Sequence, residues 1–184
     1  MEVLFINACV RKESRTKILA DYLLQKIGGN VKEINLGLDL PQPLNEETLN
    51  KRTTLIKQGA FDSEMFTYAK QFIKADTIVI AAPFWDFSFP ALLKTFIEQV
   101  NVSGLVFKYT PNGIQTLCRA KTLYYITTMG GHNPVDFGYG YIKALCQTLY
   151  GISDVRLIKA EGLDIVENDV ESLLADAKKE IDKI

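Results

Sequence analysis

Apolar runs and amphipathic segments alternate along the whole chain. Five short runs are mostly apolar and are bounded by polar or turn residues, which predicts buried strands at residues 3–6, 31–36, 76–82, 121–128 and 154–160. The segments between them repeat apolar residues at helical spacing. Strands that alternate with helices favour an α/β fold, in which helices cover both faces of a parallel sheet.

The first predicted helix shows the helical pattern most clearly. Ser14 is a suitable N-cap, and the apolar face that follows consists of Ile18, Leu19, Tyr22, Leu23 and Ile27. We expect one or two helices between about 45 and 75, and others at about 90–100, 139–150 and 168–183. Pro90 suits the first turn of its helix. Residues 102–119 are expected to form a longer irregular insertion.

The number and order of these units point to one topology. The chain has no G-x-G-x-x-G fingerprint, so a doubly wound sheet of order 2-1-3-4-5 fits better than a full dinucleotide-binding domain. We find no repeat or linker and therefore expect a single domain over residues 1–184. In this order the loops after strands one, three and four meet where ligands bind, at residues 7–16, 83–90 and 128–138.

Composition narrows the possible classes of protein. The chain has 184 residues, 47% of them hydrophobic and 23% charged, as in ordinary soluble domains. Its net charge of −1 argues against a dedicated nucleic-acid binder, and no apolar run is long enough to span a membrane. The three cysteines, Cys9, Cys118 and Cys146, form no C-x-x-C motif, so we expect a reduced, cytoplasmic setting.

The loop after the third predicted strand is rich in aromatic residues. Phe84, Trp85, Phe87 and Phe89 lie between Pro83 and Pro90, where polar turn residues would be ordinary. One interpretation is that these rings pack into the core or a subunit interface. The other is that they cover a flat apolar ligand, because an exposed aromatic cluster usually has such a partner.

The loop after the first predicted strand carries hydroxyl groups and cations into the start of a helix. Ser14 and Thr16 can donate hydrogen bonds to a phosphate, and Arg11 or Arg15 can supply positive charge. An ordinary helix cap beside a solvated basic turn is the alternative. Cys9 and Arg15 also match the C-x5-R spacing of cysteine-dependent phosphatases, although the residues between them include no glycine.

The loop after the fourth predicted strand contains Gly130 and Gly131, which allow a backbone to approach a ligand closely. His132 is the only histidine, which excludes catalytic or metal sites that need two. We keep it as a candidate on the substrate side. We predict no metal site and no catalytic triad.

Several collinear segments together resemble one family. The segment DTIVIAAPFWDF at residues 76–87 resembles the corresponding text of the FMN-dependent NADH azoreductases and NAD(P)H:quinone oxidoreductases, which are flavodoxin-like. The resemblance continues through LKTF at 93–96, FKYT at 107–110, TTMGG at 127–131 and AEG at 160–162. By this resemblance the FMN-contacting residues are Cys9, Ser14, Arg15, Thr16, Pro83, Phe84, Trp85, Asp86, Phe87, Thr128, Met129, Gly130 and Gly131.

The resemblance also implies an activity. It implies ping-pong hydride transfer from NADH or NADPH through flavin N5 to a quinone or azo acceptor, without a catalytic side chain. It further implies a homodimer with the active site at the interface, to which residues 105–109 would contribute. A flavodoxin-like electron carrier, an FMN reductase and a low-molecular-weight cysteine phosphatase that uses Cys9 and Arg15 are the alternatives.

Overall fold

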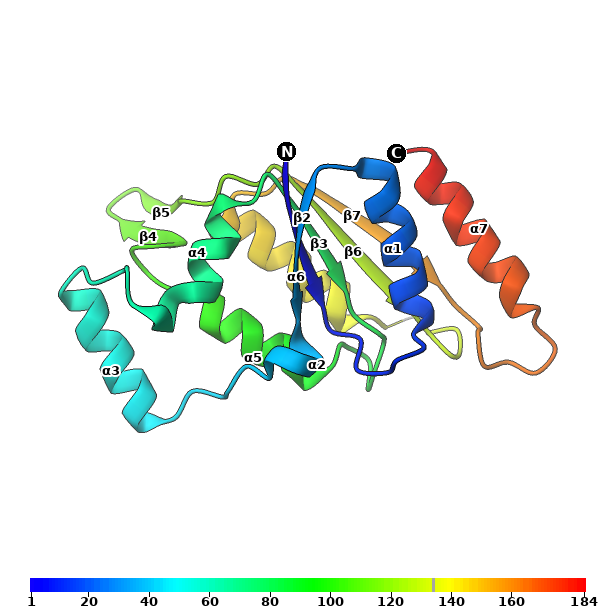
Figure 1. Cartoon of the computed structure of the whole chain (residues 1–184), viewed down its shortest axis with the longest axis horizontal. Coiled ribbons are helices and arrows are strands. Elements are labelled where there is room, and N and C mark those ends of the chain that lie inside the picture. Colours follow the sequence, from blue (N-terminus) through cyan, green and yellow to red (C-terminus); the bar gives the residue numbers. More distant parts are fainter. Residues whose placement is uncertain (134) are drawn as a thin grey trace.

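A parallel sheet runs through the centre of the computed structural model, which describes residues 1–133 and 135–184. Its five strands are β1 (Glu2–Asn7), β2 (Asn30–Asn35), β3 (Thr77–Ala81), β6 (Thr122–Thr128) and β7 (Asp154–Ala160). They lie in the order β2-β1-β3-β6-β7 with parallel pairing throughout, which confirms the predicted order 2-1-3-4-5. The carboxyl ends of the strands therefore share one edge, the lower edge in Figure 1.

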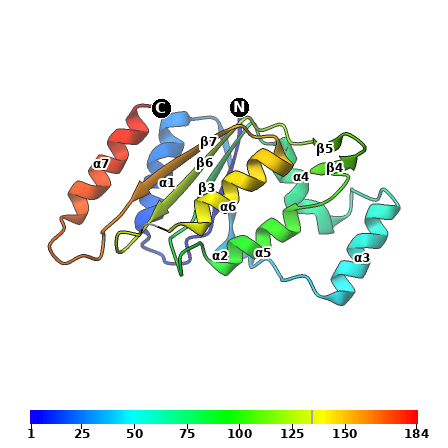
Figure 2. The ribbon, with the colours of Figure 1, turned by 180° about the vertical axis from the view of Figure 1, so that it is seen from behind.

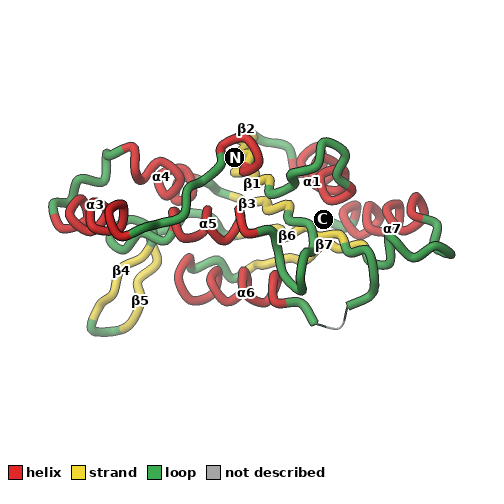
Figure 3. The backbone as a smooth tube through the Cα atoms, turned by 90° about the horizontal axis from the view of Figure 1, so that it is seen from below, coloured by secondary structure: helices red, strands yellow, loops and turns green. Residues whose placement is uncertain are grey.

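Helices cover both faces of the sheet, as expected (Figures 2 and 3). The helices on one face are α1 (Arg15–Ile27) and α7 (Val170–Asp182), and those on the other are α4 (Thr67–Lys74), α5 (Ala91–Val100) and α6 (Phe137–Leu145). Strand β3 is buried along its whole length because its side chains alternate between these two layers. Ile78 and Ile80 pack toward α4, α5 and α6, whereas Val79 and Ala81 pack toward α1 and α7.

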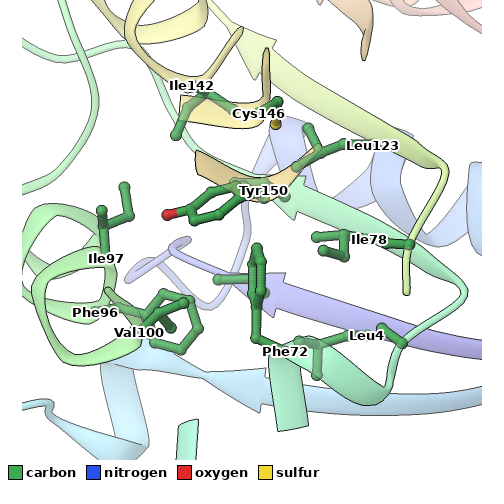
Figure 4. Packing of buried hydrophobic residues seen from close by; sticks show 14 of the residues in the cluster. Leu4, Phe72, Ile78, Phe96, Ile97, Val100, Leu123, Ile142, Cys146 and Tyr150 are labelled. Carbon is green, nitrogen blue, oxygen red and sulfur yellow. The ribbon is translucent and has the colours of Figure 1, made fainter. Parts of the chain in front are cut away.

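The larger of the two hydrophobic clusters lies under α4, α5 and α6 (Figure 4). Phe72 of α4 and Phe96 of α5 are almost fully buried there. Helix α6 continues into a π-helical turn, η2 (Cys146–Tyr150), and Tyr150 packs on Phe72 with ring centroids 4.8 Å apart. Phe96 belongs to the same cluster and packs on Tyr68 of α4 at 5.2 Å, so α5 and the aromatic loop that leads into it are held against this layer.

The segment 102–119, expected to be irregular, contains a β-hairpin, so that prediction is wrong. Strands β4 (Phe107–Thr110) and β5 (Gly113–Thr116) pair in antiparallel fashion outside the main sheet. Gly113 has φ +106°, and the Phe107 and Tyr109 rings meet edge to face at 5.5 Å. Each of these strands has only four residues, and those of β5 are mostly exposed. The sequence therefore shows too little apolar alternation for the two strands to be recognised.

The segment between β2 and β3 forms the remaining helices, α2 (Leu36–Asp39), α3 (Glu46–Lys57) and the 3₁₀ helix η1 (Glu64–Phe66). Helix α3 lies away from the sheet in Figure 1. Buried Arg52 joins it to the carboxyl end of α5 by donating to the backbone carbonyls of Glu98 and Asn101. A cation at the end of a helix also interacts favourably with the helix dipole.

Several predicted boundaries shift by a few residues for local reasons. The strand predicted to end at Leu36 ends at Asn35, whose side chain caps α2. Helix α6 begins two residues before Tyr139 because Asp136 accepts hydrogen bonds from the Gly138 and Tyr139 amides. Helix α7 begins at Val170 rather than at 168, since Asp169 is its N-cap. None of the described helices combines the length and the apolar composition needed to cross a membrane.

Candidate functional site

A cavity of about 600 Å³ lies at the carboxyl edge of the sheet, within the range that is typical of small-molecule sites. It is lined by the loops that follow β1, β3, β6 and β7, together with the first turn of α1. The lining residues are Val10, Arg11, Glu13, Ser14, Arg15, Thr16, Ile18, Pro83, Phe84, Trp85, Thr128, Met129, Gly130, Leu163 and Asp164. Segments far apart in the sequence thus form a single cavity.

The start of α1 forms one end of this cavity. Ser14 is the N-cap, as predicted, and its hydroxyl accepts a hydrogen bond of 3.3 Å from the Lys17 amide. Thr16 is buried, and its Oγ1 lies 2.6 Å from the Thr128 Oγ1, so α1 and β6 are joined directly. Backbone amides, two hydroxyl groups and the positive end of a 13-residue helix here form an arrangement suited to an anion.

The apolar face of the first helix divides between the core and the cavity. Leu19 and Leu23 of the face predicted from the sequence are buried. Ile18 itself is 47% exposed and lines the cavity. The apolar face of α1 is broader than its contact with the sheet, so Ile18 lies outside that contact. There its side chain adds apolar surface to the cavity.

The loop after β3 folds into a tight turn on another side of the cavity. Trp85 and Ser88 exchange backbone hydrogen bonds of 3.0 and 2.8 Å, and the central residues Asp86 and Phe87 have φ values of +49° and +65°. Positive φ at both central positions is the geometry of type I′ turns, which normally use Asn and Gly. Strain of this kind in non-glycine residues is concentrated at functional sites.

The aromatic residues of this loop separate into two groups. Trp85 is 40% exposed and Phe87 is 54% exposed, although both are large apolar rings. Phe84 and Trp85 line the cavity, whereas Phe89 turns toward α6 and packs against Tyr141 at 5.8 Å. Packing into the core is therefore wrong for Trp85 and Phe87, whereas packing of these two rings in a subunit interface stays a prediction.

The glycines after β6 have different surroundings. A Cβ atom on Gly130 would lie 2.3 Å from Asp164 Oδ2, so the absence of a side chain makes room for this carboxylate. A Cβ atom on Gly131 would meet no atom of the described chain within 4 Å. At Gly130 the missing side chain thus allows a close contact within the protein, and at Gly131 it leaves open space. The close approach of this loop to a ligand stays a prediction.

The loop after β7 was not predicted to belong to the site. Its residues continue the pairing with the β6 loop, since the Leu163 and Asp164 amides donate to the Met129 and Gly130 carbonyls at 3.1 and 2.8 Å. The Asp164 carboxylate forms an ion pair of 2.7 Å with Arg15 of α1. The sequence held only a general indication that this loop lies at the site. The strand β7 is parallel to β1, β3 and β6, so the loop that follows it lies at the same edge of the sheet.

Cys9, which the resemblance placed among the FMN-contacting residues, is buried behind the cavity next to Ser14. Its side chain is buried in the cluster under α1 and α7, its Sγ lies 3.8 Å from the Ala81 carbonyl, and it is not among the lining residues. Burial raises the pKa of the Cys9 thiol to about 11. A phosphatase nucleophile needs a lowered pKa and access to its substrate, so the burial of Cys9 argues against the phosphatase alternative.

The other predicted residues lie at or beyond the rim. Asp86, Phe87 and Gly131 are exposed next to lining residues, and His132 is exposed beside the β7 loop, where a Cβ atom on Gly162 would lie 3.0 Å from its Nε2. Of the segment 105–109, Val106 and Phe107 are buried and Tyr109 is 72% exposed. Only part of that segment can reach another subunit. Pro134, in the predicted loop 128–138, lies outside the described residues.

Comparisons with known proteins agree with this architecture. The sequence profile of a family described as having a flavodoxin-like fold matches residues 1–184. The FMN-dependent NADH:quinone oxidoreductase 2 of Clostridium acetobutylicum is 36% identical, over 94% of this chain and 92% of its own. The FMN-dependent NADH:quinone oxidoreductase of Coprothermobacter proteolyticus is 32% identical, over 100% of this chain and 97% of its own.

A solved structure shows the same fold. The FMN-dependent NADH-azoreductase of Bacillus anthracis, solved in complex with FMN, superposes with a TM-score of 0.84 over 100% of this chain and 97% of that one. The two sequences are 23% identical, so this similarity concerns the fold.

Proposed function

Because the chain belongs to the family of FMN-dependent NADH:quinone oxidoreductases, we propose that it binds FMN in the cavity at the carboxyl edge and transfers electrons from NADH to quinone or azo acceptors. The observation that carries this proposal is that one cavity joins the amino end of α1, with Ser14 and Thr16, to the exposed aromatic turn at Trp85. A phosphate and a flat apolar ring system need these two surfaces.

The residues present fit such a cofactor. The hydroxyls of Ser14 and Thr16 and the first amides of α1 would hold the phosphate, with Arg15 as the cation. Phe84 and Trp85 would pack on the ring system. In the turn, the Phe84 amide donates to the Thr128 carbonyl, and the Trp85 and Ser88 amides donate to each other's carbonyls. Among the described residues, no backbone carbonyl accepts a hydrogen bond from the Asp86 or Phe87 amide. These two amides would bond the polar edge of the ring.

The chemistry then divides between cofactor and protein. When bound, FMN would supply ping-pong two-electron transfer from NADH to the acceptor through its N5. The protein contributes binding and orientation through the α1 amino end and the aromatic turn. The exposed faces of Trp85 and Phe87 continue past the cavity and provide an apolar surface where a flat nicotinamide, quinone or azo compound would stack.

We also propose that the active unit is a homodimer. Tyr109 on the β4–β5 hairpin is the residue of the 105–109 segment with the largest exposed ring, and a second copy would cover it. Light scattering of the purified protein checks this part separately, and a monomer of unchanged mass at micromolar concentration would contradict it.

The central test is spectroscopic and then kinetic. Purified protein should show flavin absorbance, and NADH should bleach it, with continued NADH oxidation when menadione or an azo dye is added. Running NADPH in parallel determines the preferred reductant. A yellow protein that never oxidises NADH or NADPH with either acceptor would contradict the reductase proposal and favour the electron carrier. A colourless protein that takes up no FMN would contradict the cofactor as well.

A further inference from the structure

The ion pair between Arg15 and Asp164 uses only part of the arginine. A guanidinium group carries five N–H donors. Both hydrogens of Arg15 Nη1 are engaged, one by Asp164 Oδ1 at 2.7 Å and one by the Leu163 carbonyl at 3.0 Å. Among the described residues, no acceptor is bonded to Nε or Nη2. The arginine therefore lines the cavity with one side fixed and three donors left for a ligand.

The acceptors that hold Arg15 are themselves held in place. Leu163 is only 2% exposed, and its amide donates to the Met129 carbonyl. The Asp164 amide donates to the Gly130 carbonyl, and its carboxylate lies against Gly130, where any larger residue would collide with it. The loop after β7 is thus anchored on the loop after β6, and it presents a carbonyl and a carboxylate to α1.

We infer that Asp164 is a positioning residue for the cofactor phosphate: it holds Arg15 so that the remaining edge of the guanidinium is presented to the phosphate at the start of α1. This inference rests on the proposed function. An arginine that is already oriented loses less conformational freedom when it forms paired hydrogen bonds with phosphate. Charge-assisted bonds of this kind are also stronger than neutral ones.

A second effect of Asp164 acts in the opposite direction. Its negative charge repels a phosphate dianion, so neutralising it would favour binding if charge alone mattered. The side chains of Arg15 and Asp164 are 42% and 71% exposed, so water and salt screen this repulsion. The positional effect depends on short hydrogen bonds and persists in salt. The orientation of Arg15 should therefore outweigh the repulsion.

The experiment compares FMN with riboflavin, which has the same ring system without the phosphate. Dissociation constants are measured by flavin fluorescence for the wild type, Asp164→Asn and Glu167→Gln, which makes the same charge change at an exposed position of the same loop. Asp164→Asn should weaken FMN binding by about three- to tenfold at about 0.15 M and about 0.5 M salt, and leave riboflavin binding unchanged. Glu167→Gln should change neither.

A double variant shows whether Asp164 acts through Arg15. In an Arg15→Gln background, Asp164→Asn should cause no further loss of FMN affinity. Three results would overturn the inference while the proposed function stands: unchanged or tighter FMN binding in Asp164→Asn, an equal loss for riboflavin, or an undiminished loss in the Arg15→Gln background. Wild-type protein that binds neither flavin would overturn the proposed function, and the inference with it.

Discussion

The two edges of the sheet differ in how far their polar and aromatic groups are bonded or covered within the protein. At the amino edge, polar groups bond one another: the Asp76 carboxylate accepts from the Glu2 amide at 2.8 Å and pairs with Arg119 at 2.8 Å. The Asp76 backbone also donates to the Glu2 carbonyl and accepts from the Lys121 amide. At the carboxyl edge, a left-handed turn holds aromatic rings in solvent beside the open end of a helix. The amino edge thus has its polar groups bonded internally, whereas the carboxyl edge, where we propose the FMN site, leaves large aromatic rings exposed.

Among substitutions that test the difference between the two edges, Trp85→Ala is expected to have the largest effect on FMN binding. Trp85→Ala should weaken FMN binding about tenfold or more, because stacking of a flat ring on an aromatic side chain contributes roughly 1–3 kcal/mol. The free energy of unfolding should change by no more than about 0.5 kcal/mol, as for other exposed positions. Fluorescence titration and urea unfolding measure the two quantities. Trp85→Phe is the control that keeps an aromatic face, and unchanged FMN affinity in Trp85→Ala would show that the aromatic cluster is structural.

A matched pair of threonines tests the two edges directly. Thr16 and Thr77 are both buried, Thr16 at the carboxyl edge and Thr77 at the amino edge beside the Met1 sulfur. Thr16→Val should weaken FMN binding about fivefold or more, since it removes a hydroxyl at the proposed phosphate site. Thr77→Val should leave FMN binding unchanged. Equal effects of the two substitutions on the FMN dissociation constant would remove the distinction between the edges.

The strained turn gives a smaller and opposite effect on stability. Phe87→Gly should raise the free energy of unfolding by up to about 1 kcal/mol, because glycine adopts a φ of +65° without strain. The same substitution should weaken acceptor turnover by removing an exposed ring. Phe87→Ala keeps the strain and removes the ring, so it should show no gain in urea unfolding. A gain as large in Phe87→Ala would attribute the effect to the ring and not to the backbone.

The smallest effect is expected at the amino edge, where the Asp76 side chain is 37% exposed. The Glu2 amide, and then Arg119, lower the pKa of Asp76 below its ordinary value of 3.8. A lowered carboxyl pKa in the folded state stabilises the protein above the ordinary value, and this contribution is lost as pH falls through the folded pKa. Asp76→Asn should therefore be less stable than wild type at pH 7, and the difference should shrink toward about pH 3.

FMN binding by Asp76→Asn should equal that of the wild type at neutral pH. Unfolding by urea at several pH values, with one FMN titration, provides both measurements. A stability difference that stays constant down to the lowest pH would show that the Asp76 ionisation plays no part.

The sequence predicted the elements whose signals are strong and local. Strand β3 was recognised because all five of its residues are buried, which requires a continuous apolar run. The start of α1 was recognised because Ser14 combines cap chemistry with a following apolar face. The β4–β5 hairpin was missed, although Asn112 and Gly113 stand at its turn, because its exposed strands carry little hydrophobic pattern.

The candidate site was predictable only in part, because some of its contacts join residues far apart in the sequence and because the sequence does not show which way a side chain points. Ser14, Thr16, Phe84, Trp85 and Thr128 lie on one cavity, as the topology and the resemblance required. Asp164 reaches Arg15 across 149 positions of sequence, and no local pattern reports such a contact. Cys9 shows the limit of transferring a position: the chain continues the sheet geometry past β1, since the Ala8 amide still donates to the Ala81 carbonyl, and the Cys9 side chain turns into the core.

Thr128 has a consequence for protein engineering. Its carbonyl accepts from the Phe84 amide and its hydroxyl meets that of Thr16, so one residue touches the segments that follow β1 and β3 while it ends β6. A loop taken from a homologue and grafted alone would have to keep both of these contacts. Chimeras that exchange the three segments together should therefore retain cofactor more often than chimeras that exchange them one at a time.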